Sequence, residues 1–189
     1  FLIKKVCPNR LLKQFSHGDV VAFSPDGRQL ATASDDNAYL WDIQTGKQIE
    51  QFEHGGTVRS VIFSPDGRKL ATGSADGNIS LWNIETGKLI RQFPHAGYVW
   101  SVAFSPDGKQ LATVGSFNHY ANLWDIETVQ VIKQFPHDDS ATSVAFSPDG
   151  RQLATASDDN VYLWDIETAQ VIKQFPHDDG KLVRSVVFS

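Results

Sequence analysis

The sequence predicts an all-β fold made of one four-stranded unit that repeats along the chain. The run Phe-Ser-Pro-Asp-Gly occurs four times, and a shortened copy, Phe188-Ser189, ends the sequence. The full copies are Phe23–Gly27, Phe63–Gly67, Phe104–Gly108 and Phe146–Gly150. Four periods separate Phe23 from Phe188 and cover 165 residues, or about 41 residues each. Four-stranded antiparallel units at this spacing are typical of the blades of a β-propeller.

Each period contains four strand-like runs separated by turn residues. In the second period these runs are 58–64, 69–74, 79–84 and 89–93, where apolar and polar residues alternate. Ser-Pro-Asp-Gly fits a type I turn after the first run, because proline presets φ at the second turn position and glycine suits the fourth. Asp76-Gly77-Asn78 and Thr86-Gly87-Lys88 predict the other two turns. No apolar stripe of helical period is long enough for a helix.

Composition and charge restrict the class of protein. The 189 residues include 17 Lys and Arg against 22 Asp and Glu, a net charge of −5. This balance argues against generic binding to nucleic acid or to an anionic membrane, both of which need basic surface. A hydrophobic content of 41% is that of a packed domain, and no run approaches the roughly 18 apolar residues of a membrane helix. The single cysteine, Cys7, rules out an internal disulfide framework and a cysteine-built zinc site.

Further motifs recur in phase with the turn. Each full copy is followed by Leu-Ala-Thr and then by a Leu-Trp pair, and an Asp or Asn comes directly after the Trp. The tryptophans of these pairs are Trp41, Trp82, Trp124 and Trp164. Together with a His before each set of strands, this array resembles the WD-repeat β-propeller family, in the regular form of bacterial arrays. The resemblance covers essentially the whole chain and implies a ring of about seven blades.

Alignment of the repeats predicts the domain organisation. Residues 9–15 match residues 129–135, so 1–16 are expected to form the last two strands of an upstream blade. Four complete blades are expected at 17–53, 54–94, 95–136 and 137–176. Residues 177–189 would supply the first strand of a downstream blade. The favoured interpretation is an open arc cut from a larger ring, within a longer protein. The alternative is a five-bladed ring with one three-stranded blade.

Each repeat offers a His, a Thr, an Asp and a Trp, which invites comparison with a catalytic triad. A triad occurs once per active site, whereas this set recurs in blade after blade. The resemblance implies a buried hydrogen-bonded tetrad, and buried indole, hydroxyl and imidazole groups need such partners. The expected members are His54, Thr72, Asp76 and Trp82 in the second repeat, His95, Thr113 and Trp124 in the third, and His137, Thr155 and Trp164 in the fourth.

Irregular positions predict where blades differ. In the third repeat Phe117-Asn118-His119 replaces the Asp turn, so we expect this corner of blade 3 to be weaker. The run His137-Asp138-Asp139 predicts no metal site, because adjacent loop residues rarely converge on one ion. No cofactor motif is present. Arg91, Lys133 and Lys173 recur on the outermost strands, where charge discourages edge-to-edge aggregation.

Function is expected where the repeat departs from itself, because the shared residues are scaffold. In the resembling family, partners usually bind the face that carries the second-to-third-strand turns and the loops between blades, here called the top face. Its most exposed variable position lies four residues before the repeat Phe. This position holds Asp19, Arg59, Trp100, Thr142 and Arg184.

Blade 3 is the predicted centre of a partner site. It carries Tyr98, Trp100 and Phe117, and aromatic and arginine side chains dominate interface hot spots. The predicted site residues are Arg59, Tyr98, Trp100, Phe117, Asp139 and Thr142. The alternative for Trp100 is sideways packing into a neighbouring blade. Acidic residues on the same face favour a basic protein or peptide as partner and disfavour nucleic acid.

These observations predict a non-catalytic protein–protein interaction scaffold. It would be the propeller part of a larger regulatory or signalling protein, bacterial and cytoplasmic, with no membrane contact. Two alternatives remain at this point. One is a propeller enzyme with its site at the central tunnel, and the other is a purely structural spacer, which would show a top face that is uniform across blades.

Overall fold

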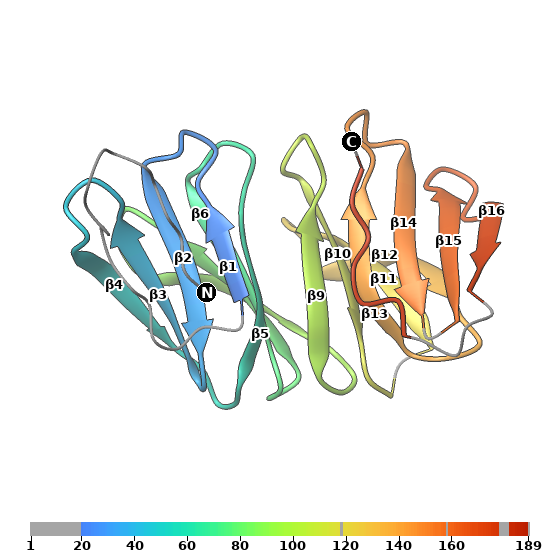
Figure 1. The fold of residues 1–189 in the computed structure, drawn as a ribbon, viewed down its shortest axis with the longest axis horizontal. Coiled ribbons are helices and arrows are strands. Elements are labelled where there is room, and N and C mark those ends of the chain that lie inside the picture. The colour runs from blue at the N-terminus through green and yellow to red at the C-terminus, as the bar shows by residue number, and fades with distance from the viewer. Residues whose placement is uncertain (1–19, 118, 158, 178–181, 189) are drawn as a thin grey trace.

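The computed structural model describes residues 20–117, 119–157, 159–177 and 182–188. This part of the chain forms sixteen strands and no helix. The strands make four separate antiparallel sheets, each with its strands in sequence order (Figure 1). The predicted all-β architecture of four-stranded blades is therefore confirmed. Residues 1–16, where two strands of an upstream blade were predicted, lie outside the described residues.

Each blade is a meander of four short strands. Blade 1 consists of β1 (Val20–Phe23), β2 (Gln29–Ser34), β3 (Asn37–Asp42) and β4 (Gln48–Glu53). Blade 2 consists of β5 (Val58–Phe63), β6 (Lys69–Ser74), β7 (Asn78–Asn83) and β8 (Leu89–Pro94). Blade 3 consists of β9 (Val99–Phe104), β10 (Gln110–Gly115), β11 (Tyr120–Asp125) and β12 (Gln130–Pro136). Blade 4 consists of β13 (Ala141–Phe146), β14 (Gln152–Ser157), β15 (Asn160–Asp165) and β16 (Val171–Pro176). The four strands of blade 2 match the predicted runs to within one residue at each end.

The Ser-Pro-Asp-Gly turn fixes the first hairpin of each blade. In blade 2 the Gly67 N–H donates to the Ser64 carbonyl at 2.9 Å, and Gly67 has a φ of 70°, which glycine adopts without strain. The Asp66 carboxylate accepts from the Ser64 hydroxyl at 2.5 Å and from the Arg68 N–H at 3.0 Å. The Ser64 bond is the main reason that the pKa of Asp66 is lowered. The same geometry recurs in the other three copies of the turn.

The apolar core lies between adjacent blades. The phenylalanine near the end of each outermost strand packs against the tryptophan of the following blade. The ring centroids are 5.0 Å apart for Phe52 and Trp82, 5.9 Å for Phe93 and Trp124, and 5.6 Å for Phe135 and Trp164. All three phenylalanines are fully buried. Burying one such ring stabilises a protein by about 1.5–3 kcal/mol, so these contacts hold successive blades together.

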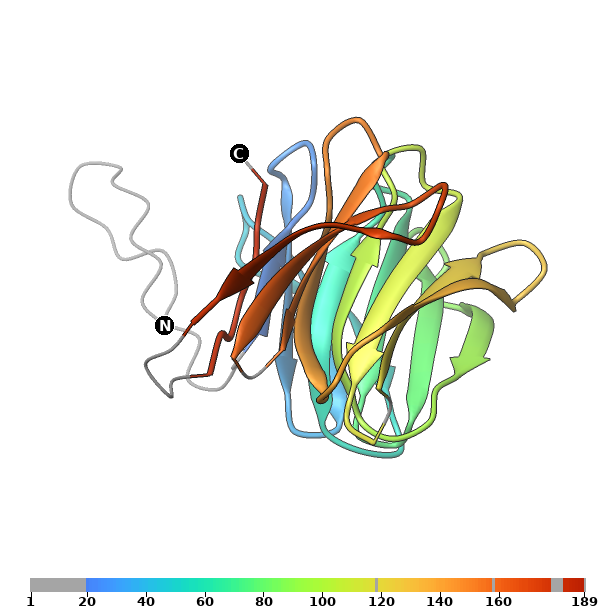
Figure 2. The same ribbon diagram turned by 90° about the vertical axis from the view of Figure 1, so that its right-hand side faces the viewer.

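The four blades form an arc that does not close. The innermost strands β1, β5, β9 and β13 lie side by side in this order (Figures 1 and 2). The flanks of the two outer blades are open. Phe23 on β1 is 55% exposed, whereas the matching Phe63 and Phe104 are buried, and Phe175 on β16 is 40% exposed. The described part of the chain is therefore an open β-propeller arc.

The C-terminal segment 182–188 runs beside β13 (Figure 1). A first strand of a further blade was predicted here, but residues 182–188 belong to no strand. The Val186 N–H donates to the Ser143 hydroxyl at 3.2 Å. Consecutive blades make the same contact where Val102 donates to Ser60. The segment thus takes the place of a next innermost strand and contacts β13 through the same kind of side-chain hydrogen bond that joins neighbouring blades.

Candidate functional site

Blades 2 and 4 each contain a buried hydrogen-bonded relay of Trp, Thr and His. In blade 2 the Trp82 indole N–H donates to Thr72 Oγ1 at 3.0 Å, and Thr72 Oγ1 lies 2.7 Å from His54 Nε2. The same contacts recur in blade 4, at 2.8 Å and 2.7 Å, among Trp164, Thr155 and His137. In blade 1 Trp41 donates to Thr32 at 2.9 Å, and His17 lies outside the described residues. The relay gives every buried polar group in it a partner.

The histidine of this relay is neutral. His54 Nδ1 lies 3.0 Å from the Phe52 carbonyl oxygen, which can only accept, so Nδ1 carries the proton and Nε2 accepts from Thr72. Burial lowers the pKa of His54 and lowers that of His137 to about 4. Thr72 is fully buried and already accepts from the indole, so a substrate carbonyl cannot reach its hydroxyl.

Asp76 does not belong to the relay. Its Oδ2 accepts from the Gly55 N–H at 3.0 Å and its Oδ1 accepts from the Asn78 N–H at 2.8 Å. His54 directs Nδ1 at a backbone carbonyl instead of this carboxylate. The predicted tetrad of blade 2 is therefore a bonded triplet, and Asp76 fixes the loop and turn above it.

The relay is incomplete in blade 3. Trp124 donates to Thr113 Oγ1 at 2.9 Å, but His95 does not reach this hydroxyl. His95 Nδ1 lies 3.4 Å from the Gly97 carbonyl oxygen. His95 Nε2 is buried and has no hydrogen-bond partner among the described residues. A buried polar atom in this state costs about 1–3 kcal/mol, which supports the predicted weak corner of blade 3.

Gly115 explains the position of His95. Blades 2 and 4 have Ser74 and Ser157 at this point of the second strand. A Cβ atom on Gly115 would lie 2.7 Å from His95 Cε1, so the imidazole occupies space that a serine side chain takes in the other blades. Sequence analysis assigned the irregularity to the turn after β10 and missed Gly115. Its signal was a glycine in place of the repeated serine.

In three innermost strands, a β-bulge changes the direction of the side chain at the variable position. In β9 the pairing with β10 shifts between Val99 and Ser101, which leaves Trp100 as the extra residue. The same shift leaves Arg59 as the extra residue of β5 and Thr142 as that of β13. A bulge turns the side chain of its extra residue away from the regular alternation of the strand. The three variable side chains therefore leave the cores of their blades.

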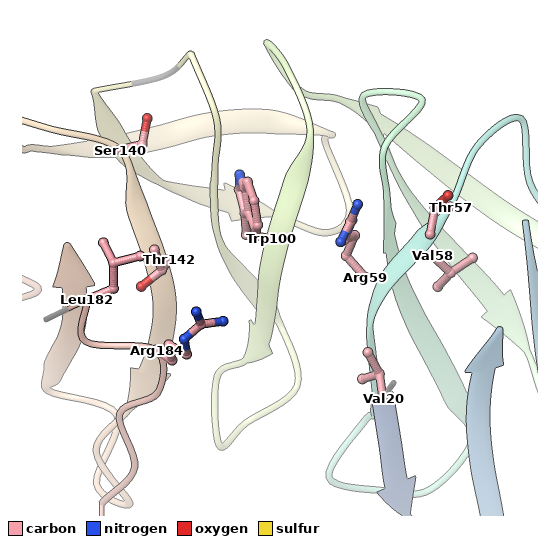
Figure 3. A pocket seen from close by; sticks show the side chains of 9 residues that line it. All are labelled: Val20, Thr57, Val58, Arg59, Trp100, Ser140, Thr142, Leu182 and Arg184. Atoms are coloured by element: carbon pink, nitrogen blue, oxygen red, sulfur yellow. The ribbon is translucent and has the colours of Figure 1, made fainter. Parts of the chain in front are cut away.

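These bulged residues line one concavity of about 490 Å³, on the side of the innermost strands (Figure 3). Its lining combines two arginines, three hydroxyl side chains, one tryptophan and three aliphatic side chains. The lining residues are Val20, Thr57, Val58, Arg59, Trp100, Ser140, Thr142, Leu182 and Arg184. Every blade and the segment 182–188 contribute. Asp19, at the matching variable position of blade 1, lies outside the described residues.

Arg59 and Trp100 connect blades 2 and 3 inside this concavity. The Arg59 guanidinium carbon lies 5.6 Å from the centroid of the Trp100 ring, a cation–π contact. Trp100 nevertheless remains 40% exposed. It therefore meets its neighbouring blade through Arg59 and still presents its ring to the concavity. Both residues occupy the predicted variable position, and both line the concavity.

Tyr98 and Phe117 lie together outside the concavity. Their rings pack edge to face with centroids 6.1 Å apart. The Tyr98 N–H donates to the Ser116 hydroxyl at 3.0 Å, which ties the loop before β9 to the loop after β10. Phe117 is 80% exposed and has a φ of 59°. Blade 3 thus carries an exposed aromatic pair, and one of its members, Tyr98, lies two residues before Trp100 in the sequence.

Asp139 belongs to blade 4 and does not line the concavity. Burial raises the pKa of Tyr162 of β15, and the negative charges of Asp138 and Asp139 raise it further. The structure therefore divides the six predicted site residues into three places. Arg59, Trp100 and Thr142 share the concavity, Tyr98 and Phe117 form a pair, and Asp139 lies in the loop before β13. Val20 and Val58 also line the concavity, and sequence analysis did not predict them.

Comparison with known proteins finds one matching family. Residues 19–189 match the family described as IFT122 first beta-propeller. The chain belongs to this family. It is a WD-repeat-type β-propeller, in agreement with the four blades and their repeated Trp–Thr contacts. No protein of curated function matches the chain.

No helix among the described residues has the length and hydrophobicity needed to span a bilayer. The described residues also contain no group of three or more His, Cys, Asp or Glu side chains that could hold a metal ion. His137, which precedes Asp138 and Asp139, directs its ring nitrogens to Phe135 and Thr155 instead.

Proposed function

We propose that this chain is a protein-interaction scaffold whose partner binds this concavity, with Trp100 as the anchor. One observation carries the proposal. The variable position four residues before the repeat Phe is also the position that bulges, and Arg59, Trp100 and Thr142 all line one concavity. The scaffold role is supported by membership in a propeller family.

The composition of the concavity favours binding over catalysis. Its described lining residues include no Asp, Glu, His or Cys, which are the side chains that most often act as general acids, bases and nucleophiles. A structural spacer would show the same side chain in each blade. The observed positions instead carry arginine, tryptophan and threonine, so the surface is specialised. We place this scaffold in a larger cytoplasmic regulatory or signalling protein.

The proposed partner is a protein or peptide with basic residues at its periphery. Asp138 and Asp139 lie in the loop before β13 that also carries Ser140 of the concavity. Charges at the edge of an interface mainly steer association. Replacement of Asp139 by Lys should therefore slow association about threefold and weaken its salt dependence, while dissociation changes little. An unchanged association rate would contradict a basic partner.

A capture experiment tests the site. The 189-residue chain is used as bait in a cell lysate, and the wild type is compared with Trp100→Ala. A buried aromatic anchor contributes about 2 kcal/mol or more, so the variant should bind its partners roughly 30-fold more weakly. Arg68→Glu is the control, because Arg68 lies in the exposed Ser-Pro-Asp-Gly turn of blade 2. Equal recovery with Trp100→Ala, together with loss of partners in Arg68→Glu, would overturn the assignment.

A further inference from the structure

We propose that the concavity recognises acidic side chains of a peptide, which pair with Arg59 and Arg184, and an adjacent apolar side chain that packs on Trp100. This inference rests on the proposed function and specifies the chemistry of its ligand. Its first support is charge. Both charged residues that line the concavity among the described residues are arginines, in a chain whose net charge is −5.

Neither arginine is neutralised within the part of the chain that the structure describes. The ion pair found there joins Arg28 and Asp26, in the first turn of blade 1. Arg59 and Arg184 are both exposed, and their guanidinium groups reach the concavity from opposite sides of Trp100 (Figure 3). Two guanidinium groups at the walls of one concavity, without an ion-pair partner among the described residues, favour anionic side chains in a ligand.

Arg59 is oriented before any ligand arrives. Its guanidinium carbon lies 5.6 Å from the centroid of the Trp100 ring, and a guanidinium held over an aromatic ring keeps N–H groups available for an anion. A planar fork of N–H donors matches both oxygens of a carboxylate. Arg59 is therefore suited to bidentate recognition, which a lysine at this position could not provide.

Arg184 is positioned through its backbone. The Thr142 hydroxyl donates to the Val183 carbonyl at 2.6 Å, and the Val186 N–H donates to Ser143 at 3.2 Å. These two bonds bracket Arg184 and fix its segment against β13. Thr142, the bulged residue of blade 4, thus holds the second arginine at the concavity.

The size and apolar lining indicate a peptide. A volume of about 490 Å³ lies within the range of about 300–1,000 Å³ that ligand pockets span, and it exceeds what one carboxylate fills. Val20, Val58 and Leu182 supply apolar wall beside the Trp100 ring. An aspartate or glutamate next to an aliphatic or aromatic residue satisfies both parts of the surface.

The probe is a phage library of random heptapeptides, selected on the 189-residue chain. We expect the selected peptides to carry Asp or Glu beside an apolar residue. In the best binder, replacement of the acid by its amide should weaken binding tenfold or more, measured by fluorescence anisotropy. Arg59→Ala and Arg184→Ala should each weaken binding by a similar factor, and Arg59→Lys should restore only part of it. Arg68→Ala, which removes the same charge from an exposed turn, should change binding by less than twofold.

The outcomes separate this inference from the proposed function. Enrichment of basic peptides, or of peptides that bind Arg59→Ala and Arg59→Lys as well as they bind the wild type, would overturn the acidic ligand. The proposed function would survive that result if Trp100→Ala still abolished binding. If the selected peptides bound Trp100→Ala and both arginine variants unchanged, the concavity would not be the partner site and both statements would be wrong. Failure to select any peptide would also overturn the inference.

Discussion

The Val102 N–H of blade 3 donates a hydrogen bond of 3.1 Å to the Ser60 hydroxyl of blade 2. Both groups are buried, and the contact joins two innermost strands that are 42 residues apart in the sequence. Its counterpart between blades 3 and 4 runs from Val144 to Ser101 at 3.4 Å. The contact holds neighbouring blades at their inner edges, while the Phe–Trp pairs hold them near the outer strands.

Replacement of Ser60 by Ala should destabilise the arc by about 1–3 kcal/mol, because the buried Val102 N–H loses its acceptor. The measurement is the free energy of unfolding in urea. Ser101→Ala is the matched variant, and it should cost less because its hydrogen bond is longer and only partly buried. Equal losses of unfolding free energy in the two variants would show that the hydrogen bond between Val102 and Ser60 does not cause the destabilisation.

The relay predicts different effects of one substitution in two blades. Thr72→Val removes the hydroxyl that bonds both His54 and Trp82, and it should cost about 2–3 kcal/mol of unfolding free energy. Thr113→Val removes only the acceptor of Trp124 and should cost about 1 kcal/mol. Thermal unfolding monitored by circular dichroism measures both. A larger loss for Thr113→Val would contradict the incomplete relay of blade 3.

Stability should fall as the pH is lowered from about 6.5 to about 4. Burial lowers the pKa of His137 from 6.5 to about 4, so between these values the unfolded chain binds a proton that the folded chain does not. The stabilisation is complete above the unfolded pKa and is lost as the pH falls toward the folded pKa. For His137 alone the loss amounts to about 3 kcal/mol.

Urea unfolding at pH 7 and pH 5 measures this loss. His137→Gln cannot titrate, so it should be less stable than the wild type at pH 7 and should lose less stability between the two pH values. Burial lowers the pKa of His54 and His95 as well, so the wild type and His137→Gln both keep part of the pH dependence of stability. A wild-type stability that is flat across this range would contradict the neutral relay.

Lys133 should stabilise the contact between blades 3 and 4. Its Nζ donates to the Ile166 carbonyl at 2.6 Å and also to the Glu167 carbonyl of the following blade. Sequence analysis assigned this lysine to edge protection, and the structure shows that it joins two blades. Lys133→Met should cost about 1–2 kcal/mol, since a hydrogen bond to a charged donor is lost.

Lys173 provides the control, because it occupies the same position in blade 4. Its Nζ lies 5.0 Å from the centroid of the Phe175 ring, within its own strand. Lys173→Met should therefore cost about 0.5 kcal/mol. Chemical unfolding of the two variants compares them, and similar losses would assign both lysines to the surface alone.

The sequence by itself determined the repeated unit. Ser-Pro-Asp-Gly specifies a local turn, and alternation around the Leu-Trp pairs specifies strands, so blade number and strand bounds follow from interactions within a few residues. The variability of the position four residues before each repeat Phe also follows from the sequence alone. Both inferences use only periodicity and local chemistry.

Only the tertiary structure decided where the variable side chains point and what they meet. A bulge moves one residue out of the alternation, and the sequence pattern of Trp100 does not differ from that of a regular strand residue. The space left by Gly115, which draws His95 away from Thr113, likewise depends on how two strands approach one another. Arg59 and Arg184 lie far apart in the sequence. They reach one concavity because blades stack at a fixed repeat, which places equivalent positions side by side, and this stacking is a property of the packed blades.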